Sequence, residues 1–196
     1  MLHPLFMPTY GMILYMAAMR VRTPNLPSIY IHIGIITTFV LTALIPIILM
    51  LILWKRGSIS SLHIDNASER TTPYVYTLIC FGFWCYFVGM IIKMPFVWLI
   101  VAIGATVALM AVTIINRWWK ISAHLTALGG LLGGVFSIAL YYSMLPTMLI
   151  IGILLVSLLL MYARLYLDAH TPMQVVCGYI LGLICTFIPN LIIYHA

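Results

Sequence analysis

The chain has 196 residues, of which 65% are hydrophobic and only 6% are charged, and its mean hydropathy is +1.19. Soluble globular domains carry about 25% charged residues, so this composition excludes a soluble protein and predicts one integral membrane domain over residues 1–196. The net charge of +6 comes from Lys and Arg in short loops between apolar runs. This pattern favours membrane lipids or an anionic substrate as partners and argues against nucleic acid.

Seven apolar segments follow one another along the chain, and each is a candidate for a membrane-spanning helix of about 20 residues. They cover residues 3–19, 28–54, 73–92, 95–115, 124–142, 146–163 and 172–194. The first is the weakest, because it is short and contains Pro4, Pro8 and Gly11, so it either spans the membrane or stays re-entrant or interfacial. The pattern predicts an all-α, polytopic membrane helix bundle with six to seven transmembrane helices.

Small residues inside two of the later segments predict close helix packing. The run "GGLLGG" (129–134) lies in the fifth segment, and Gly178 and Gly182 have small-xxx-small spacing in the seventh. The four cysteines also lie in apolar runs and form no C-x-x-C pair. We therefore interpret them as buried apolar residues and expect neither disulfides nor metal ligands there.

The loops between the segments alternate between two sides, and one side carries most of the polar residues. The first side, called face A, carries loops 55–72, 116–123 and 164–171. The other side, called face B, carries loops 20–27, 93–94 and 143–146. Most of the side chains able to do chemistry lie on or next to face A: His63, Asp65, Glu69, Arg70, Lys120, His124, Arg164, Asp168 and His170. We expect face A to be the working face.

Three predicted helices begin at face A, and their first turns favour an anion. The helix starts are indicated by "TTP" (71–73), by Ser122 as a cap, and by "TP" (171–172). Free N–H groups and the positive end of the helix dipole make such starts suitable for anions. The nearby cations are Arg70, Lys120 and Arg164. Together these features predict a phosphate site.

Two histidines, His124 and His170, adjoin this cationic region. A histidine can attack phosphorus or deliver a proton to a leaving group, and an arginine holds phosphate oxygens with its planar fork. Phosphoryl transfer needs mainly positioning and charge neutralisation. The residue types therefore favour phosphoryl transfer at face A.

Three segments carry a spacing pattern that resembles a known family. They are "HIDNASERT" (63–71), "ISAH" (121–124) and "ARLYLDAHTPMQ" (163–174). Their order and spacing resemble the type 2 phosphatidic acid phosphatase superfamily, which has Lys, six residues, Arg-Pro; then Pro-Ser-Gly-His; then Ser-Arg, five residues, His, three residues, Asp. The placement of each segment before a helix also resembles that family, over residues 28–194.

The resemblance implies a membrane phosphatase that acts on a lipid phosphate or lipid diphosphate without a metal or other cofactor. His170 would be the nucleophile that forms a phospho-histidine, and His124 the general acid for the leaving alcohol. The phosphoryl oxygens would be bound by Arg70, Arg164 and Ser122. The resemblance also implies an active site on the extracytoplasmic face of a bacterial inner (cytoplasmic) membrane.

The segments also depart from the family motifs. His63 and Thr71 replace the Lys and Pro of the first motif, and we suggest that Lys120 or His63 supplies the missing positive charge. Gln174 replaces the Asp that orients the nucleophilic histidine. The carbonyl of Gln174 can still accept a hydrogen bond, but it carries no charge.

Other interpretations fit the same residues. A non-catalytic relative would bind anionic lipid or a membrane partner without turnover, as the neutral Gln174 suggests. A metal-dependent hydrolase would use three histidines with one carboxylate, which leaves an open zinc position. Its ligands would be His63, His124 and His170 with Asp65 or Asp168. Arg164 and Asp168 are also four residues apart and could form a simple helix ion pair.

Overall fold

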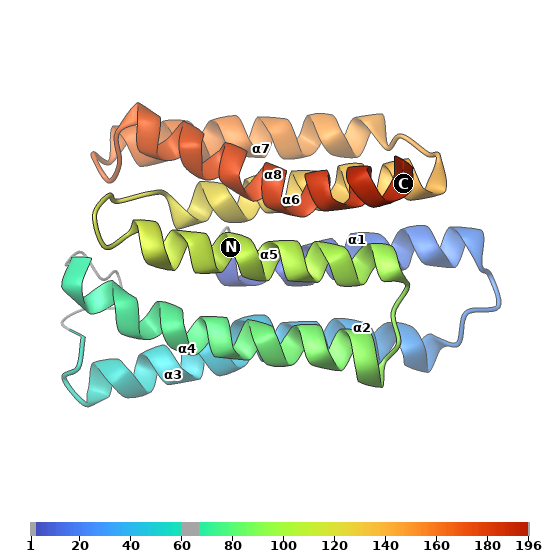
Figure 1. Ribbon diagram of the computed structural model, residues 1–196, viewed down its shortest axis with the longest axis horizontal. Helices are drawn as coiled ribbons and strands as arrows, with labels where there is room; N and C mark the ends of the chain where they lie inside the picture. The colour runs from blue at the N-terminus through green and yellow to red at the C-terminus, as the bar shows by residue number, and fades with distance from the viewer. Residues whose placement is uncertain (1–2, 60–66, 196) are drawn as a thin grey trace.

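The computed structural model describes residues 3–59 and 67–195, with the backbone alone for 67–70, and this part of the chain is a bundle of helices (Figure 1). The short segments are a 3-10 turn η1 (Pro4–Phe6) and two π-helical turns, η2 (Val40–Leu44) and η3 (Phe87–Ile91). The α-helices are α1 (Met7–Arg22), α2 (Ser28–Phe39), α3 (Ile45–Lys55), α4 (Ala67–Tyr86), α5 (Phe96–Ile115), α6 (Ala123–Tyr142), α7 (Thr147–Tyr166) and α8 (Pro172–His195).

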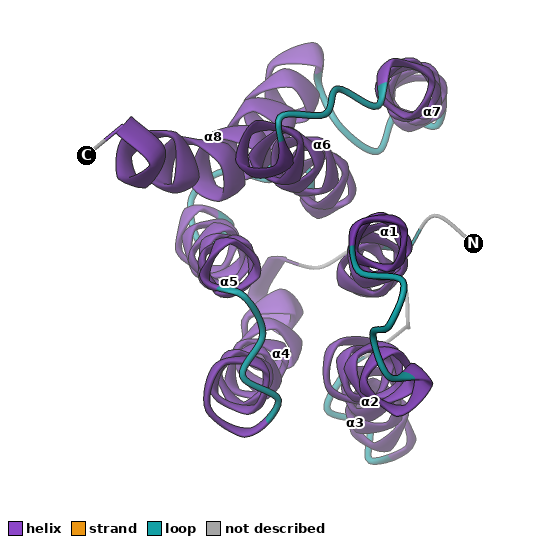
Figure 2. Ribbon diagram, turned by 90° about the vertical axis from the view of Figure 1, so that its right-hand side faces the viewer, coloured by secondary structure: helices purple, strands orange, loops and turns teal. Residues whose placement is uncertain are grey.

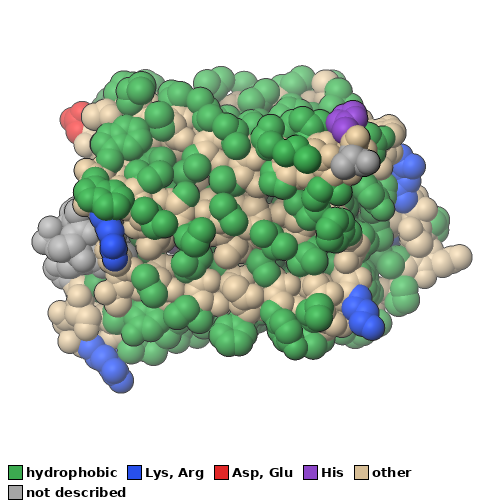
Figure 3. Space-filling view, in the orientation of Figure 1, with side chains coloured by type: hydrophobic (Ala, Val, Ile, Leu, Met, Phe, Trp, Pro, Cys, Tyr) green, Lys and Arg blue, Asp and Glu red, His purple; other side chains and the backbone are tan. Residues whose placement is uncertain are grey.

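Six helical stretches among the described residues are long and apolar enough to cross a membrane. They are Ser28–Lys55, Thr71–Ile91, Phe96–Ile115, Ala123–Tyr142, Thr147–Tyr166 and Pro172–His195. Their presence confirms the predicted all-α polytopic bundle and identifies the chain as a membrane protein. Hydrophobic side chains cover the middle of the face drawn in Figure 3, whereas Lys and Arg lie toward its two ends.

The alternation of the loops confirms the two predicted faces. The end of α3, the start of α4 and the connections α5–α6 and α7–α8 lie at the left end of the bundle in Figure 1, which is face A. The connections α1–α2, α4–α5 and α6–α7 lie at the opposite end, which is face B. The residues predicted for chemistry on 116–124 and 164–174 therefore lie at one end of the bundle.

The predicted helix start at "TTP" (71–73), before the segment 73–92, was wrong. α4 begins at Ala67 and contains Pro73 in its interior. The preceding residues include Ala67, Glu69 and Arg70, which are strong helix formers, so the helix starts before the Thr-Thr-Pro signal instead of at it. Ser122 does occupy the N-cap position of α6, but its side chain makes no capping hydrogen bond.

Helices α6 and α8 meet along a closed seam of glycines, as predicted. A Cβ atom on Gly182 would lie 1.9 Å from the carbonyl oxygen of Thr126, and one on Gly129 would lie 2.0 Å from that of Tyr179. Such distances let the two backbones touch. We call this contact the α6–α8 seam, formed by Gly129, Gly133, Gly178 and Gly182. The seam brings the start of α6 against the start of α8.

Helix α1 lies between α2 and α6 (Figure 2). Its sixteen residues span roughly 24 Å, which is less than the hydrocarbon thickness of about 30 Å. Met12 and Tyr15 are fully buried, and the Tyr15 ring stacks on Trp98 with centroids 5.0 Å apart. In Figure 1 the start of α1 lies well inside the bundle and does not reach face A. This short helix positions the cavity described below.

Candidate functional site

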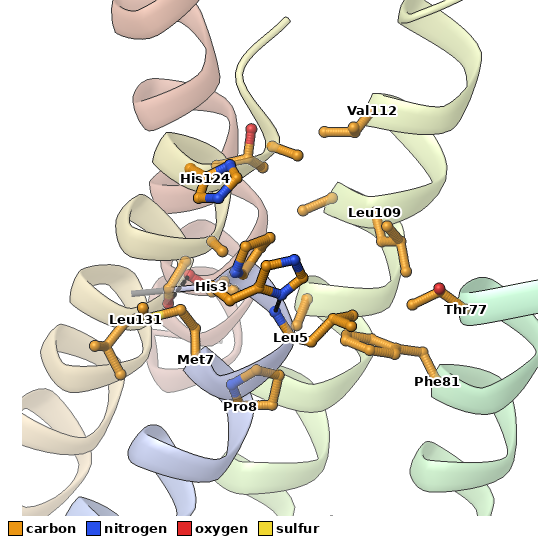
Figure 4. A pocket seen from close by; sticks show the side chains of 18 of the residues that line it. His3, Leu5, Met7, Pro8, Thr77, Phe81, Leu109, Val112, His124 and Leu131 are labelled. Atoms are coloured by element: carbon orange, nitrogen blue, oxygen red, sulfur yellow. Dashed lines mark hydrogen bonds between the residues drawn. The ribbon is translucent and has the colours of Figure 1, made fainter. Parts of the chain in front are cut away.

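A cavity of 560 Å³ lies among α1, α4, α5 and α6, and its polar residues gather at the face A end. The polar lining there comes from His3, Lys120, His124, Arg164 and His170. Much of the remaining wall is apolar and includes Phe81, Trp84, Trp98, Val101, Leu131 and Ile138. Figure 4 shows His124 and Val112 at one level of the cavity, with His3 and then Pro8 farther along it. We call the five polar residues, His3, Lys120, His124, Arg164 and His170, the polar end of the cavity.

The polar end is assembled from separate parts of the chain. Lys120 lies in the α5–α6 loop, His124 in the first turn of α6, and Arg164 in the last turn of α7. The Arg164 Nη2 lies 2.5 Å from Nδ1 and 3.0 Å from Nε2 of His124. Because a guanidinium only donates, the His124 nitrogen that receives this bond is unprotonated. The two residues predicted to handle phosphate therefore touch each other.

His170 lies in the loop before α8 and is held through one ring nitrogen. Its Nδ1 lies 3.0 Å from the backbone carbonyl of Lys120 and 3.3 Å from Oε1 of Gln174. Both partners are acceptors, so Nδ1 carries the proton and Nε2 keeps its lone pair. Burial lowers the pKa of His170, and the nearby positive charges of Lys120 and Arg164 lower it further, against the raising effect of the two hydrogen bonds.

Gln174 also caps α8. The N–H of Thr171 donates to Oε1 of Gln174 at 3.1 Å, and the N–H of Gln174 lies 3.5 Å from Oγ1 of Thr171. This reciprocal pair is a capping box at the helix N-terminus. The Gln174 carbonyl oxygen thus serves the helix start and the imidazole of His170 at once. The predicted orienting contact between Gln174 and His170 is present.

The structure does not bring every predicted phosphate-binding side chain to the cavity. Ser122 is fully buried in the α6–α8 contact, where its N–H donates to the carbonyl of Gln174 at 3.2 Å. Its hydroxyl has no partner among the described residues, and Ser122 does not line the cavity. Arg70 belongs to the first turn of α4, but its side chain lies outside the described part, as does the whole of His63.

The suggested ion pair between Arg164 and Asp168 is absent from the described residues. Asp168 is exposed and adopts a left-handed backbone conformation with φ 48°. This turn directs the chain from α7 into α8 and takes Asp168 off the helix, where an i,i+4 contact would form. Arg164 therefore remains available to His124 and to the cavity.

His3 is the residue of the polar end that the sequence did not indicate. Its ring packs edge-on against His124, with centroids 5.6 Å apart, and its Nδ1 accepts a hydrogen bond from the N–H of Leu5 at 3.4 Å. Burial and then the charge of Arg164 lower the pKa of His3. One sequence signal existed: segment 3–19 is short for a membrane span, which is compatible with one of its ends lying at depth.

The metal-dependent alternative has no ligand cluster in the described part of the chain. There, no group of three or more His, Cys, Asp or Glu side chains is placed to hold a metal ion. His63 and Asp65, which that alternative needs, lie outside the described residues. His124 and His170 instead contact Arg164 and backbone or amide oxygens.

Comparison with known proteins returns no match among family models, curated proteins or solved structures. The resemblance to the phosphatase superfamily stays a prediction based on the three spaced segments. What the fold adds is the placement of these residues: segments near 120 and near 170 meet at the start of α8, and Arg164 reaches α6 from the end of α7.

Proposed function

We propose that the chain is a membrane-embedded phosphatase that hydrolyses a lipid phosphate or lipid diphosphate through a phospho-histidine intermediate. One observation carries this proposal. Lys120, Arg164, His124 and His170 converge at one end of an otherwise largely apolar cavity inside a membrane bundle. An amphiphile with an anionic head and a hydrocarbon tail matches that distribution of charge.

The cations of the polar end would bind the phosphoryl group. Arg164 presents a planar fork of N–H donors, and Lys120 adds a mobile positive charge. In a site shielded from water these charges act more strongly than they would at a surface. An incoming phosphate would compete for the N–H groups that Arg164 now directs at His124. Phosphate binding would therefore release His124 for proton transfer.

The chemistry follows from the two histidines. Nε2 of His170 would attack phosphorus, and the P–O bond to the leaving alcohol would break as the N–P bond forms. The electron pair stays on the leaving oxygen, which takes a proton from His124, the histidine having been protonated once the bound phosphate has drawn Arg164 away from it. A water molecule would then give its proton to His124 and attack phosphorus. The N–P bond breaks, phosphate leaves, and both histidines return to their starting forms.

The partners of Nδ1 would support the charge that His170 gains in this reaction. As Nε2 bonds to phosphorus the imidazole becomes positive, and its Nδ1–H bonds to the Lys120 carbonyl and to Gln174 strengthen. These bonds also fix the tautomer in which Nε2 has its lone pair. Gln174 provides a dipole where the family motif has a carboxylate.

The first test is phosphate release by purified protein in detergent, with EDTA present. Phosphatidic acid, phosphatidylglycerol phosphate, an isoprenyl diphosphate and a monoalkyl phosphate would be offered to the natural protein and to His170→Ala. Turnover that is lost in His170→Ala, together with a phospho-enzyme trapped by acid quench in the natural protein alone, supports the proposal. Turnover that survives His170→Ala rejects the phospho-histidine mechanism.

Two observations favour the second candidate, a non-catalytic phosphatase-like protein that binds anionic lipid or a membrane partner. Gln174 is neutral and is already used in the capping box of α8, and the ring nitrogens of His124 are approached by Arg164. This candidate predicts lipid phosphate binding that Arg164→Ala weakens, with no release of phosphate. Folded protein that binds lipid phosphate without hydrolysing any of the four substrates would establish it in place of the enzyme.

A further inference from the structure

The cavity extends along much of α6. Ala123 and Ile138 on α6 both line it, and fifteen residues of helix correspond to roughly 22 Å. Spread over that length, the volume of 560 Å³ leaves a mean cross-section of roughly 25 Å². A mean cross-section of this size fits one extended hydrocarbon chain and is too small for two chains to lie side by side along the whole length.

Three threonine hydroxyls in the wall already donate hydrogen bonds to backbone carbonyls of their own helices. Thr77 donates to the carbonyl of Pro73 at 2.8 Å, Thr126 to that of Ser122 at 3.0 Å, and Thr186 to that of Gly182 at 3.0 Å. A buried water needs two to four polar partners, and these threonines have no hydrogen left to offer one. The Nε1–H of Trp98 is an unpaired donor in this part of the wall, but its other neighbours there are mostly apolar. Beyond its polar end, the cavity therefore suits hydrocarbon better than water.

The charge of the polar end orients an occupant. A chain that lies along Leu131, Val101 and Ile138 would place an anionic head beside Lys120, Arg164 and His170. We propose that the cavity binds the chain of a single-chain lipid phosphate, such as a monoalkyl or isoprenyl phosphate or diphosphate, and that it excludes two-chain lipids. At about 30 Å³ for each water-sized group, it holds roughly 19 carbons. This inference rests on the proposed function, because it specifies the substrate of that same site.

Ala105 offers a way to shorten the channel. It lines the cavity on α5, seven residues beyond Val112 at the polar end, which corresponds to roughly 10 Å. Leucine at this position would fill the channel part-way and leave the first third or more open. Ala111 lies on the same helix and does not line the cavity, so Ala111→Leu is the matched control for an added side chain on α5.

The first experiment compares hydrolysis at equal mole fraction in mixed micelles. The substrates are octyl phosphate, octadecyl phosphate and dioctadecanoyl phosphatidic acid. We expect octadecyl phosphate to be preferred over the two-chain lipid by about tenfold or more, and Ala105→Leu to lower its use about tenfold while octyl phosphate changes less than about twofold. Ala111→Leu should leave all ratios unchanged. Equal use of one-chain and two-chain substrates overturns the proposal.

A second experiment needs no turnover, so it separates this inference from the proposed function. His170→Ala would be mixed with a hexadecyl phosphate that carries a diazirine at the chain terminus, and the cross-linked peptides would be mapped after irradiation. Cross-links to α5 near Trp98 or to α6 near Ile138 would place the chain inside the bundle, even if no substrate is hydrolysed. Cross-links confined to outward residues such as Leu155 or Leu159 would overturn the proposal.

Discussion

Helix α6 has small residues on two of its faces: one face packs tightly against a neighbouring helix, and the other lines the cavity. Toward α8, Gly129 and Gly133 meet backbone atoms, and the α6–α8 seam is closed. Toward α1 and α5, Ala127 and Gly134 line the cavity. The difference lies in the partner: α8 runs along α6 in direct contact, whereas α1 begins part-way along the bundle and leaves a space beyond its start. A small residue closes an interface only where a backbone is there to meet it.

Gly182→Ala should disrupt the closed α6–α8 seam, and we expect it to have the largest effect of the substitutions considered. The new Cβ would lie 1.9 Å from the Thr126 carbonyl oxygen and 2.7 Å from the N–H nitrogen of Gly130, so the helices must separate. Because backbone atoms cannot move aside as side chains do, we expect a loss of about 3 kcal/mol or more in the free energy of unfolding. Unfolding in detergent, followed by circular dichroism, measures it.

Gly152→Ala is the matched control, because a Cβ on this α7 glycine meets nothing within 4 Å. Alanine there should raise stability by about 0.5–1 kcal/mol through helix propensity. Equal effects at Gly152 and Gly182 would contradict the view that backbone contact makes the α6–α8 seam.

Most helix bounds were predictable because long apolar runs are punctuated by short polar loops. The segment 96–115 was predicted as 95–115, and 123–142 as 124–142. The start of α4 was not, since a Thr-Thr-Pro signal is local and competes with good helix formers before it. The π turns at 40–44 and 87–91 were also missed, because the apolar pattern continues through them without a break.

The site was predictable where one spacing determines one contact. His170 and Gln174 are four residues apart, and their hydrogen bond forms as expected. The Ser122 side chain was not predictable, because an N-cap position constrains the backbone without choosing the side-chain rotamer. His3 was missed because its place depends on how far α1 is inserted into the bundle, which only packing against α6 determines.

Arg164→Ala, at the polar end of the cavity, should lower kcat/KM about a hundredfold. The substitution removes the cation that contacts His124 and lines the cavity, and a charge-assisted phosphate contact contributes about 2–3 kcal/mol in a shielded site. Arg164→Lys should recover only part of this loss, since lysine lacks the planar fork. Steady-state kinetics with octadecyl phosphate gives both values.

Arg22 serves as the control for charge at the opposite end. It lies on face B, where it donates to the backbone carbonyl of Tyr142 and lies 5.8 Å from the centre of that ring. Arg22→Lys should leave kcat/KM unchanged within about twofold. A similar loss at Arg22 and Arg164 would mean that the measured effect comes from global stability and not from the site.

The pH dependence of kcat/KM in the natural protein should show that His170 acts in its unprotonated form. Because burial lowers its pKa from the ordinary value of 6.5, kcat/KM should stay level down to about pH 6.5 and then fall up to tenfold per unit. The unfolded histidine binds its proton at the higher pH, so stability should also decrease as the pH falls below 6.5. An acid limb centred above pH 6.5 would exclude His170 as the group that titrates.

Gln174→Glu tests the role of the amide, and we expect it to raise kcat by about fivefold. Glutamate keeps the capping box and places a carboxylate where Oε1 now meets Nδ1 of His170. We expect the pKa of His170 and the acid limb to rise by about one unit, and kcat on the plateau to rise because the carboxylate stabilises the positive imidazole. Gln174→Ala, which removes both contacts, should lower kcat.

His3→Ala should have the smallest effect, a decrease of about threefold in kcat/KM with little change in stability. The ring packs against His124 and forms part of the cavity wall next to it, so its removal leaves His124 less well positioned and widens the channel next to it.

His32→Ala is the control, because His32 is an exposed histidine whose Nδ1 lies 2.7 Å from the Ser28 carbonyl near face B. A loss of about a hundredfold or more at His3 would assign the proton donor to His3 instead of His124, since Arg164 already approaches both nitrogens of His124. The position at which α1 begins would then supply the proton donor of the site as well as the volume of the cavity.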